Sequence, residues 1–418
     1  MPRQKLHRPA ALFARTLLGA LAAAAACGAR ADDPNPYYLG VSASLAHDSN
    51  VYRVPDRVPI LTGGTRADTY WGAGLVGGFD QAYGRQRFYA DANVRNNNYV
   101  NNKDLDNVSY GLNAGWDWAT IDRLSGGVNV SANQSLATQD NNNTNLPTFA
   151  RNVVNTEQLA ARVRWGGDGA LNLDGAYSHS HVGYSLATST DSSQDSASVG
   201  ASYRVGPTLR LGAGLRFSRT TESNASDSSN GTNLDLSADW RATAQSGLNA
   251  RLSYTRQTNA GSGGTEFSGL TGALTGTYAP TSKLAFNATV SHDAGSNSTF
   301  YNLANSNTGQ SVTSLSQNTQ TTTAYLFGAS YAATAKIGVT AGVQYRHNKV
   351  DDRVNLQNTP GDTHDDNTFT ASLGTNYAIA RNWSLACSLA YMKRDVSGLV
   401  PYAYNANTVS CSTQYTLR

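Results

Sequence analysis

Apolar and polar side chains alternate strictly along much of this chain, most clearly from Val108 to Trp118. Every even-numbered residue of that stretch is apolar or aromatic, and every odd-numbered residue is Ser, Gly, Asn or Asp. Since successive side chains of a β-strand point to opposite faces, the stretch predicts a strand with one apolar face and one polar face. Its length of about eleven residues suffices to cross a bilayer as a tilted strand.

The same alternation recurs to the end of the chain and predicts about eighteen strands of roughly nine to thirteen residues, with about sixteen as the alternative count. In Leu209–Arg219, for example, Leu211, Leu215 and Phe217 alternate with polar or small residues. The predicted strands are Tyr38–His47, Thr69–Phe79, Arg87–Tyr99, Asn107–Trp118, Leu124–Ser135, Thr156–Trp165, Leu171–His181, Ser196–Val205, Leu209–Arg219, Asn233–Arg241, Leu248–Gln257, Phe267–Tyr278, Leu284–Asp293, Thr321–Tyr331, Ile337–Arg346, Thr368–Ile379, Trp383–Lys393 and Thr408–Leu417.

The connections between these strands mostly alternate in length. Short ones such as Ala119–Arg123 and Gly206–Thr208 alternate with longer ones such as Asp48–Asp68 and Ala294–Gln320. Outer-membrane barrels have short periplasmic turns and long outer loops. In lipid an open sheet edge would leave backbone groups unpaired, so a spanning sheet closes on itself. We therefore predict an all-β fold, a single transmembrane antiparallel up-and-down β-barrel in the outer membrane of a Gram-negative bacterium.

The polar face of the strands carries many charges, which a dry core would not hold unpaired. They predict a water-filled lumen with the apolar face turned to lipid, the reverse of a soluble barrel. The predicted lumen-lining charges, which are candidates for a solute path, are Asp91, Arg95, Arg162, Arg164, Arg204, Arg210, Arg216, Asp235, Asp239, Arg241, Arg251 and Arg346.

Aromatic residues stand near the strand ends on the apolar face, and they predict two belts at the membrane interfaces. The belt toward the long loops contains Tyr177, Phe217, Tyr254, Tyr345, Phe369 and Tyr391. The belt beside the short turns contains Trp116, Trp118, Trp165, Tyr203, Trp240, Tyr278, Tyr377 and Trp383.

Residues 1–31 have the features of a secretory signal peptide. Basic residues precede the short apolar run Leu17–Ala26, and Ala29-Arg30-Ala31 is an A-x-A cleavage site. The mature barrel is then predicted to occupy residues 32–418. A lipoprotein acylated at Cys27 is the alternative.

The composition narrows the class of protein further. Only 39% of the residues are hydrophobic, below the usual 45–50%, which indicates either disorder or a wet interior. The 22 Tyr and 6 Trp, placed mostly in register with the alternation, favour the wet interior. The net charge of +3 is too small to indicate a nucleic-acid partner. The chain has no apolar run long enough for a helical membrane span.

The predicted inward arginines lie mostly in the periplasmic half of the wall, and two interpretations remain open. They could form a basic constriction that favours anionic solutes, such as a uronate-bearing polysaccharide. Alternatively, they pair with Asp174, Asp235 and Asp239 across strands and only keep the lumen hydrated, which is the interpretation we favour. Inward tyrosines, which would stack on sugars, are limited to Tyr89 and Tyr99.

Other polar clusters favour no enzyme, metal or cofactor. His179 and His181 could form a metal pair or part of a hydrolase site, but their outward parity near a long loop favours interfacial residues. The chain has no Gly-x-Ser-x-Gly elbow and no metal-ligand cluster. The oxygen-rich segments Asp140–Asn143 and His364–Asn367 could bind calcium weakly, but we interpret them as solvated loop tips.

Cys387 and Cys411 fall on neighbouring predicted strands, both with lipid-facing parity. A cross-strand disulfide requires the two residues to lie opposite each other, with Cα atoms within about 7 Å. Because the strand register cannot be read from the sequence, the alternative of two small apolar residues facing lipid is preferred.

Several segments resemble a known family, the outer-membrane β-barrel proteins called EpsL, encoded in exopolysaccharide biosynthesis operons. The resembling segments are Ser42–Arg53, Tyr83–Phe88, Trp116–Trp118 and Arg123–Gly126. The closing segment Val409–Leu417 also resembles the strand that barrel-assembly machinery recognises, although the chain ends Tyr415-Thr416-Leu417-Arg418 without a final aromatic. The resemblance implies a barrel that works with polysaccharide synthesis and export proteins.

Three functions follow as hypotheses. The first, implied by the resemblance, is a conduit or accessory for exopolysaccharide export, with polysaccharide and periplasmic export proteins as partners. The second is a general diffusion porin for small solutes. The third is a structural or adhesive surface protein that uses the long loop Ala294–Gln320. In all three the partners include outer-membrane lipid and barrel-assembly machinery.

Overall fold

We analysed a computed structural model of the chain. It describes residues 36–60, 63–137, 149–167, 169–186, 191–223, 228–259, 266–294, 320–352, 362–397 and 403–417. The predicted signal peptide, with Cys27, and the segment Asp140–Asn143 lie outside these residues.

Within the described residues, eighteen strands form the fold, one for each predicted strand, and the chain also has a 3₁₀ turn, η1 (Lys103–Leu105). The strands are β1 (Tyr37–Asp48), β2 (Asp68–Tyr83), β3 (Gln86–Tyr99), β4 (Asn107–Ala119), β5 (Leu124–Leu136), β6 (Val153–Trp165), β7 (Leu171–Tyr184), β8 (Ser192–Arg204), β9 (Leu209–Glu222), β10 (Ser228–Trp240), β11 (Ser246–Asn259), β12 (Glu266–Tyr278), β13 (Leu284–Ala294), β14 (Gln320–Ala332), β15 (Ile337–Asp352), β16 (Asp362–Ala380), β17 (Trp383–Val396) and β18 (Tyr404–Leu417).

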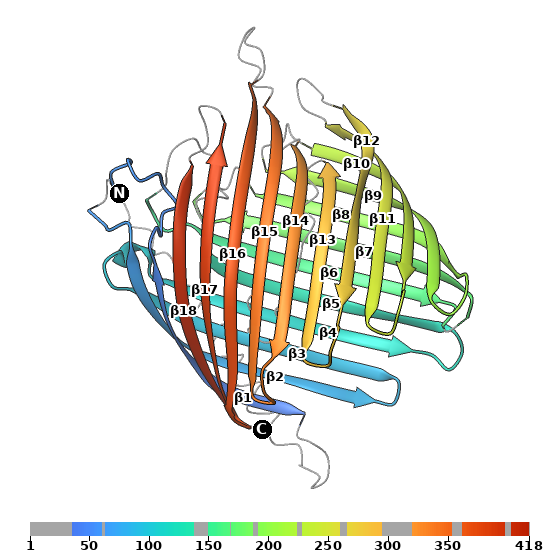
Figure 1. Cartoon of the computed structure of the whole chain (residues 1–418), viewed down its shortest axis with the longest axis horizontal. Coiled ribbons are helices and arrows are strands. Elements are labelled where there is room, and N and C mark those ends of the chain that lie inside the picture. Colours follow the sequence, from blue (N-terminus) through green and yellow to red (C-terminus); the bar gives the residue numbers. More distant parts are fainter. Residues whose placement is uncertain are drawn as a thin grey trace, which may run out of the picture.

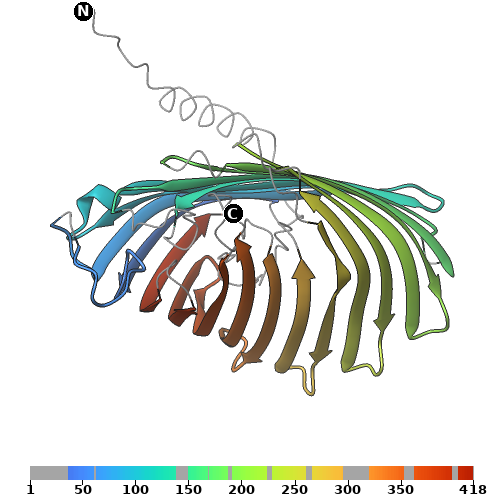
Figure 2. The ribbon, with the colours of Figure 1, turned by 90° about the horizontal axis from the view of Figure 1, so that it is seen from above.

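Each strand pairs antiparallel with its neighbours in the chain, and the sheet closes on itself. β1 pairs with β18 from Leu39 opposite Leu417 to Asp48 opposite Thr408. The result is the predicted up-and-down barrel, and the count of 18 is confirmed. Seen from above, the wall is a flattened ring, with the blue-to-green strands on one broad side and the yellow-to-red strands on the other (Figure 2).

The strands are staggered around the ring. Following paired residues once around the wall returns to β1 displaced by about 22 residues. With ordinary strand spacing and rise, this stagger corresponds to a tilt of roughly 40°. Strands on opposite walls therefore cross, as β13–β18 cross β2–β6 in Figure 1.

Large apolar side chains point outward, and polar side chains point inward. Along β1, Leu39, Val41 and Leu45 are between 53% and 58% exposed, whereas Ser42 and Asp48, on the opposite face, are buried. The register carries this division from strand to strand, because Val41 pairs with Leu75 and Leu75 with Val94. The apolar face therefore surrounds the barrel as lipid-facing surface, which places the protein in the outer membrane.

The two groups of aromatic residues lie at two heights on this outer surface. Once the stagger is taken into account, the eight residues beside the short turns share one height to within about two residues. The group toward the long loops lies about seven residues higher, a separation of roughly 20 Å along the barrel axis. This separation is close to the apolar band of about 25 Å in outer-membrane barrels. Among the described residues, no helix is long and apolar enough to cross a bilayer.

Most strands extend further toward the long loops than predicted. β16, for example, begins at Asp362, so His364–Asn367 belongs to a strand, and the prediction of a loop tip there is wrong. Asp366 points inward and accepts hydrogen bonds of 2.9 and 2.7 Å from the Arg394 guanidinium. Pairing of backbone groups with β15 and β17 offsets the weak intrinsic strand preference of these polar residues.

Cys387 and Cys411 lie directly opposite each other on β17 and β18, with Cα atoms 4.0 Å apart, and they form a disulfide. The preferred prediction of two unlinked residues is therefore wrong. The disulfide lies on the lipid-facing side and joins the last two strands beside the closing pair β1–β18.

Candidate functional site: the inner wall of the barrel

All of the predicted lumen-lining residues occupy inward positions. Asp91 and Arg95 lie on β3, Arg162 and Arg164 on β6, Arg204 on β8, Arg210 and Arg216 on β9, Asp235 and Asp239 on β10, Arg251 on β11 and Arg346 on β15, while Arg241 follows the last residue of β10. Most of these charges belong to one arc of the wall, β3 to β11. The remaining arc, β12 to β18, presents mainly uncharged polar groups.

A chain of alternating charges crosses the first strands of this charged arc near the short turns. Arg87 pairs with Asp80 at 2.5 Å and lies 4.0 Å from Asp117, which pairs with Arg162 at 3.0 Å. Asp117 and Arg162 are on β4 and β6 and meet over Gly127 of β5, where a Cβ atom would stand 2.6 Å from the Asp117 carboxylate. These groups remain half exposed to the lumen, so their pairs keep the wall hydrated more than they stabilise it.

Further inward charges pair along the same arc and, for Asp293 of β13, just beyond it. Arg216 of β9 donates to both oxygens of Asp235 at 3.0 and 3.1 Å, and the Ser253 hydroxyl donates to Asp235 at 2.5 Å. Arg251 of β11 reaches past β12 to Asp293 at 3.0 Å. Arg164 pairs with Asp174 at 2.5 Å. Here the favoured interpretation, in which arginines pair with carboxylates across strands, agrees with the contacts.

Three arginines at the periplasmic mouth do not form such ion pairs. Within the described residues, Arg204, Arg210 and Arg241 have no carboxylate within salt-bridge distance. Arg204 and Arg210 face each other across β8 and β9, and Arg210 donates to the Ser202 hydroxyl at 3.2 Å. Asp239 lies opposite Arg210 in the register without forming an ion pair. The mouth therefore carries an excess of positive charge on this arc, which is the feature that the basic-constriction interpretation requires.

The opposite arc, β12 to β18, presents mainly hydroxyl and amide groups. Thr275 bonds Thr289 at 3.0 Å, and Ser388 bonds Ser410 at 2.8 Å, across neighbouring strands. Other inward residues of this arc are Ser330, Thr340, Gln344, Ser372, Asn376 and Gln414. In Figure 2 this arc, yellow to red, faces the charged arc across the flattened lumen. A solute crossing the barrel would meet cationic groups on one side and neutral hydrogen-bonding groups on the other.

The two tyrosines predicted to point inward have different surroundings. Tyr89 lines the wall: its ring fits over Gly115, the Arg87 guanidinium lies 5.0 Å from its centroid, and Asn129 donates to its hydroxyl at 3.3 Å. Tyr99 is only 6% exposed and packs beneath loops. Tyr99 is on the inward face, as predicted, but it does not line an open surface on which a sugar could stack.

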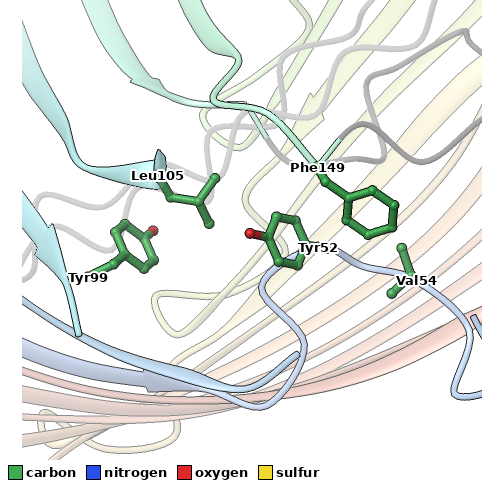
Figure 3. Close-up of a cluster of buried hydrophobic side chains, with 5 residues drawn as sticks. All are labelled: Tyr52, Val54, Tyr99, Leu105 and Phe149. Atoms are coloured by element: carbon green, nitrogen blue, oxygen red, sulfur yellow. The ribbon is translucent and has the colours of Figure 1, made fainter. Parts of the chain in front are cut away.

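Tyr99 belongs to an apolar cluster at the outer end of the barrel that the sequence analysis did not anticipate. Tyr52 and Val54 of the first long loop pack with Tyr99, Leu105 of η1 and Phe149 before β6. Figure 3 shows the Tyr52 ring between Leu105 and Phe149, and its centroid is 5.3 Å from that of Phe149. The apolar residues Val51, Tyr52 and Val54 inside a polar loop were the available signal. Burial of these side chains fixes the first loop against the lumen side of the wall.

Polar contacts fix the same loop at the closing seam. Arg53 forms a two-pronged pair with Asp48, both bonds 2.7 Å, and the two side chains are only 12% and 8% exposed. Asn50 donates to the Asn405 carbonyl on β18 at 3.0 Å, and Thr408 donates to Asp48 at 3.1 Å. The first loop therefore joins β1 to β18 from the inside.

His179 and His181 lie outward on β7, as their parity predicted. Their Nδ1 atoms contact Asp195 and Ser193, respectively, both at 2.9 Å. Among the described residues, no group of three His, Cys, Asp or Glu side chains could hold a metal ion.

Comparisons with known proteins find likeness at the level of backbone architecture. No family model matches the chain. No curated protein matches it. Among solved structures, OccAB4 of Acinetobacter baumannii is similar at a TM-score of 0.49 and 12% identity, covering 93% of this chain and 100% of that one. OpdK of Pseudomonas aeruginosa, solved with vanillate, has a TM-score of 0.49 and 12% identity, with 91% and 99% covered. We assign neither family nor solute from these likenesses.

Proposed function

We propose that the protein is a diffusion porin, a passive path for small polar solutes across the outer membrane. The observation that carries this proposal is the polar inner face of a closed wall of 18 strands. Barrels of about sixteen to eighteen strands enclose enough space for an aqueous channel. Passive diffusion requires only that the inner wall is hydrated and polar.

The charge on the wall supports a preference for anions. Arg204, Arg210 and Arg241 add positive charge at the periplasmic mouth without forming ion pairs among the described residues, whereas Arg164, Arg216 and Arg251 are each paired with a carboxylate. A cluster of like charges at the mouth of a passage with low-dielectric walls raises the local concentration of counter-ions. Hydroxyl and amide groups on the facing arc would bind the polar groups of the same solute.

Reconstitution of the purified full-length mature protein in a planar bilayer tests the proposal. We expect steady, voltage-tolerant conductance steps in potassium chloride and a reversal potential, under a salt gradient, that shows weak anion preference. Liposome swelling in neutral sugars of increasing size gives a second measure of an open path. A barrel that is silent in both assays would contradict the porin function.

The export role implied by the family resemblance stays a prediction. Ser42–Arg53, which carries part of that resemblance, covers the second part of β1 and the start of the first loop with its seam contacts. Under this hypothesis the isolated barrel is silent and conducts only with partner proteins, so the same bilayer experiment separates the two functions. The adhesive hypothesis rests on residues 295–319, which lie outside the described residues.

A further inference from the structure

Five of the chain's 7 histidines lie at one height on the outer surface of the barrel. His47, His179, His181, His292 and His347 lie on outward positions of upward strands, near the long loops. After correction for the strand stagger, they fall at one height to within about two residues, or roughly 5 Å, either way. This height coincides with the outer aromatic belt. We call these five residues the histidine girdle.

Every residue of the histidine girdle makes the same contact. Its Nδ1 atom bonds the side chain directly opposite on the next strand, at 2.8 to 2.9 Å. The partners are Thr69, Asp195, Ser193, Thr323 and Asn367, respectively. This contact fixes the ring and leaves Nε2 on its far side.

The partner of Nδ1 determines whether Nε2 can donate a hydrogen bond. Opposite Thr69, Ser193 and Thr323, a hydroxyl can either donate to Nδ1 or accept from it, and in the tautomer in which the hydroxyl donates, Nε2 carries the proton and can donate outward. Opposite Asp195 and Asn367, an oxygen accepts from Nδ1, so Nε2 donates only when the imidazole is cationic. Acidification therefore increases both the number of outward donors and the positive charge of the girdle.

Charged groups facing the girdle come from several strands. Arg219 and Arg256 lie outward at the same height on β9 and β11. Glu157 is opposite His181, Asp195 is opposite both His179 and Arg219, and the Asp365 carboxylate is 4.0 Å from Nε2 of His347. His47 lies between Val409 and Thr69, and His292 between Gly272 and Thr323, without charged neighbours in the register.

From this geometry we propose that the histidine girdle, with Arg219 and Arg256, binds the phosphate groups of the phosphorylated glycolipid in the outer leaflet. Amphipathic rings at this depth meet headgroups and not acyl chains. Guanidinium and imidazole donors match phosphate oxygens in charge and geometry. The contacts would seat the barrel at a defined depth and would strengthen as the medium becomes more acidic.

Lipid retention in nanodiscs tests this proposal. The full-length mature barrel is placed in phosphatidylcholine nanodiscs containing bis-phosphorylated lipid A or its dephosphorylated form, at about pH 5.5 and pH 7.5, and bound lipid A is counted by native mass spectrometry. We expect about threefold more phosphorylated than dephosphorylated lipid on the wild-type barrel at the lower pH, and a smaller ratio at the higher pH.

The decisive variant replaces all five girdle histidines with glutamine, which can still bond the opposite strand. We expect it to lose the preference for phosphorylated lipid at the lower pH. A control carrying Asn96→Gln, Gln134→Asn and Asn230→Gln changes outward polar residues near the same height and should behave as wild type. If the fivefold variant fails to fold, His47→Gln with His292→Gln should lose about half of the preference. An unchanged preference in the folded histidine variant, or equal retention of the two lipids by wild type, would overturn the proposal.

Discussion

Replacing Arg53 with methionine is expected to lower the free energy of unfolding by about 3 kcal/mol, because the buried Asp48 carboxylate loses its charged partner. Both side chains of this pair are almost fully buried, and the pair holds the first loop against the seam between β1 and β18. Urea unfolding of the barrel in lipid vesicles measures the change. Proteolysis should also cut the first loop of the variant before any other described segment.

Arg87→Met provides the matched control. It removes a guanidinium from a pair with Asp80 at a similar distance, 2.5 Å, but the two side chains are 52% and 55% exposed. Water solvates the remaining carboxylate, so this variant should unfold close to the wild-type midpoint. Equal destabilisation by the two substitutions would show that burial at the seam does not stabilise the barrel.

The second large effect is expected on ion selectivity. Changing Arg204, Arg210 and Arg241 together to glutamine removes three positive charges that form no ion pair among the described residues and leaves the nearby carboxylates, such as Asp239, in place. The anion-to-cation permeability ratio should fall by roughly fivefold, from anion preference to cation preference. Reversal potentials under a potassium chloride gradient measure this ratio.

A variant with the same loss of charge on the outer surface is the control for this prediction. Arg219→Gln, Arg256→Gln and Lys349→Gln remove three charges that face away from the lumen. Salt screens exposed charges beyond about one Debye length, so the permeability ratio should stay near the wild-type value. If both triple variants shift the ratio equally, the path does not run along the inner wall.

The strand count and the direction of the two faces follow from alternation alone. In Leu209–Arg219 every second side chain is apolar, and the structure turns Leu211, Leu215 and Phe217 outward, at 43–50% exposure. The signal is strong because lipid on one side and water on the other demand opposite side chains at successive positions.

The signal fades where strands leave the apolar region. In Asp365–Asn367 both faces of β16 are polar, since Asp365 and Asn367 point outward near the headgroups and Asp366 points inward to water. Alternation therefore ends several residues before the backbone pairing does. This is why His364–Asn367 resembled a loop in the sequence.

Contacts that depend on register could not be predicted. Cys387 lies opposite Cys411 only because Trp383 pairs with Tyr415, and the sequence contains no local mark of that alignment. Arg162 reaches Asp117 across a whole strand because Gly127 between them has no side chain. The cluster of Tyr52, Leu105 and Phe149 likewise joins three loops whose relative positions arise only when the barrel closes.

The central claim is that apolar side chains face lipid and polar side chains face water across one thin wall. Two adjacent positions midway along β10 test it: Leu236, 52% exposed on the outer face, and Ser237 on the inner face. Each is changed to cysteine, spin-labelled, and measured by electron paramagnetic resonance in bilayers with oxygen and a nickel chelate as relaxers. We expect the label at 236 to be relaxed by oxygen and shielded from the chelate, and the label at 237 to show the reverse. The same accessibility at both positions, or the opposite assignment, would contradict the account.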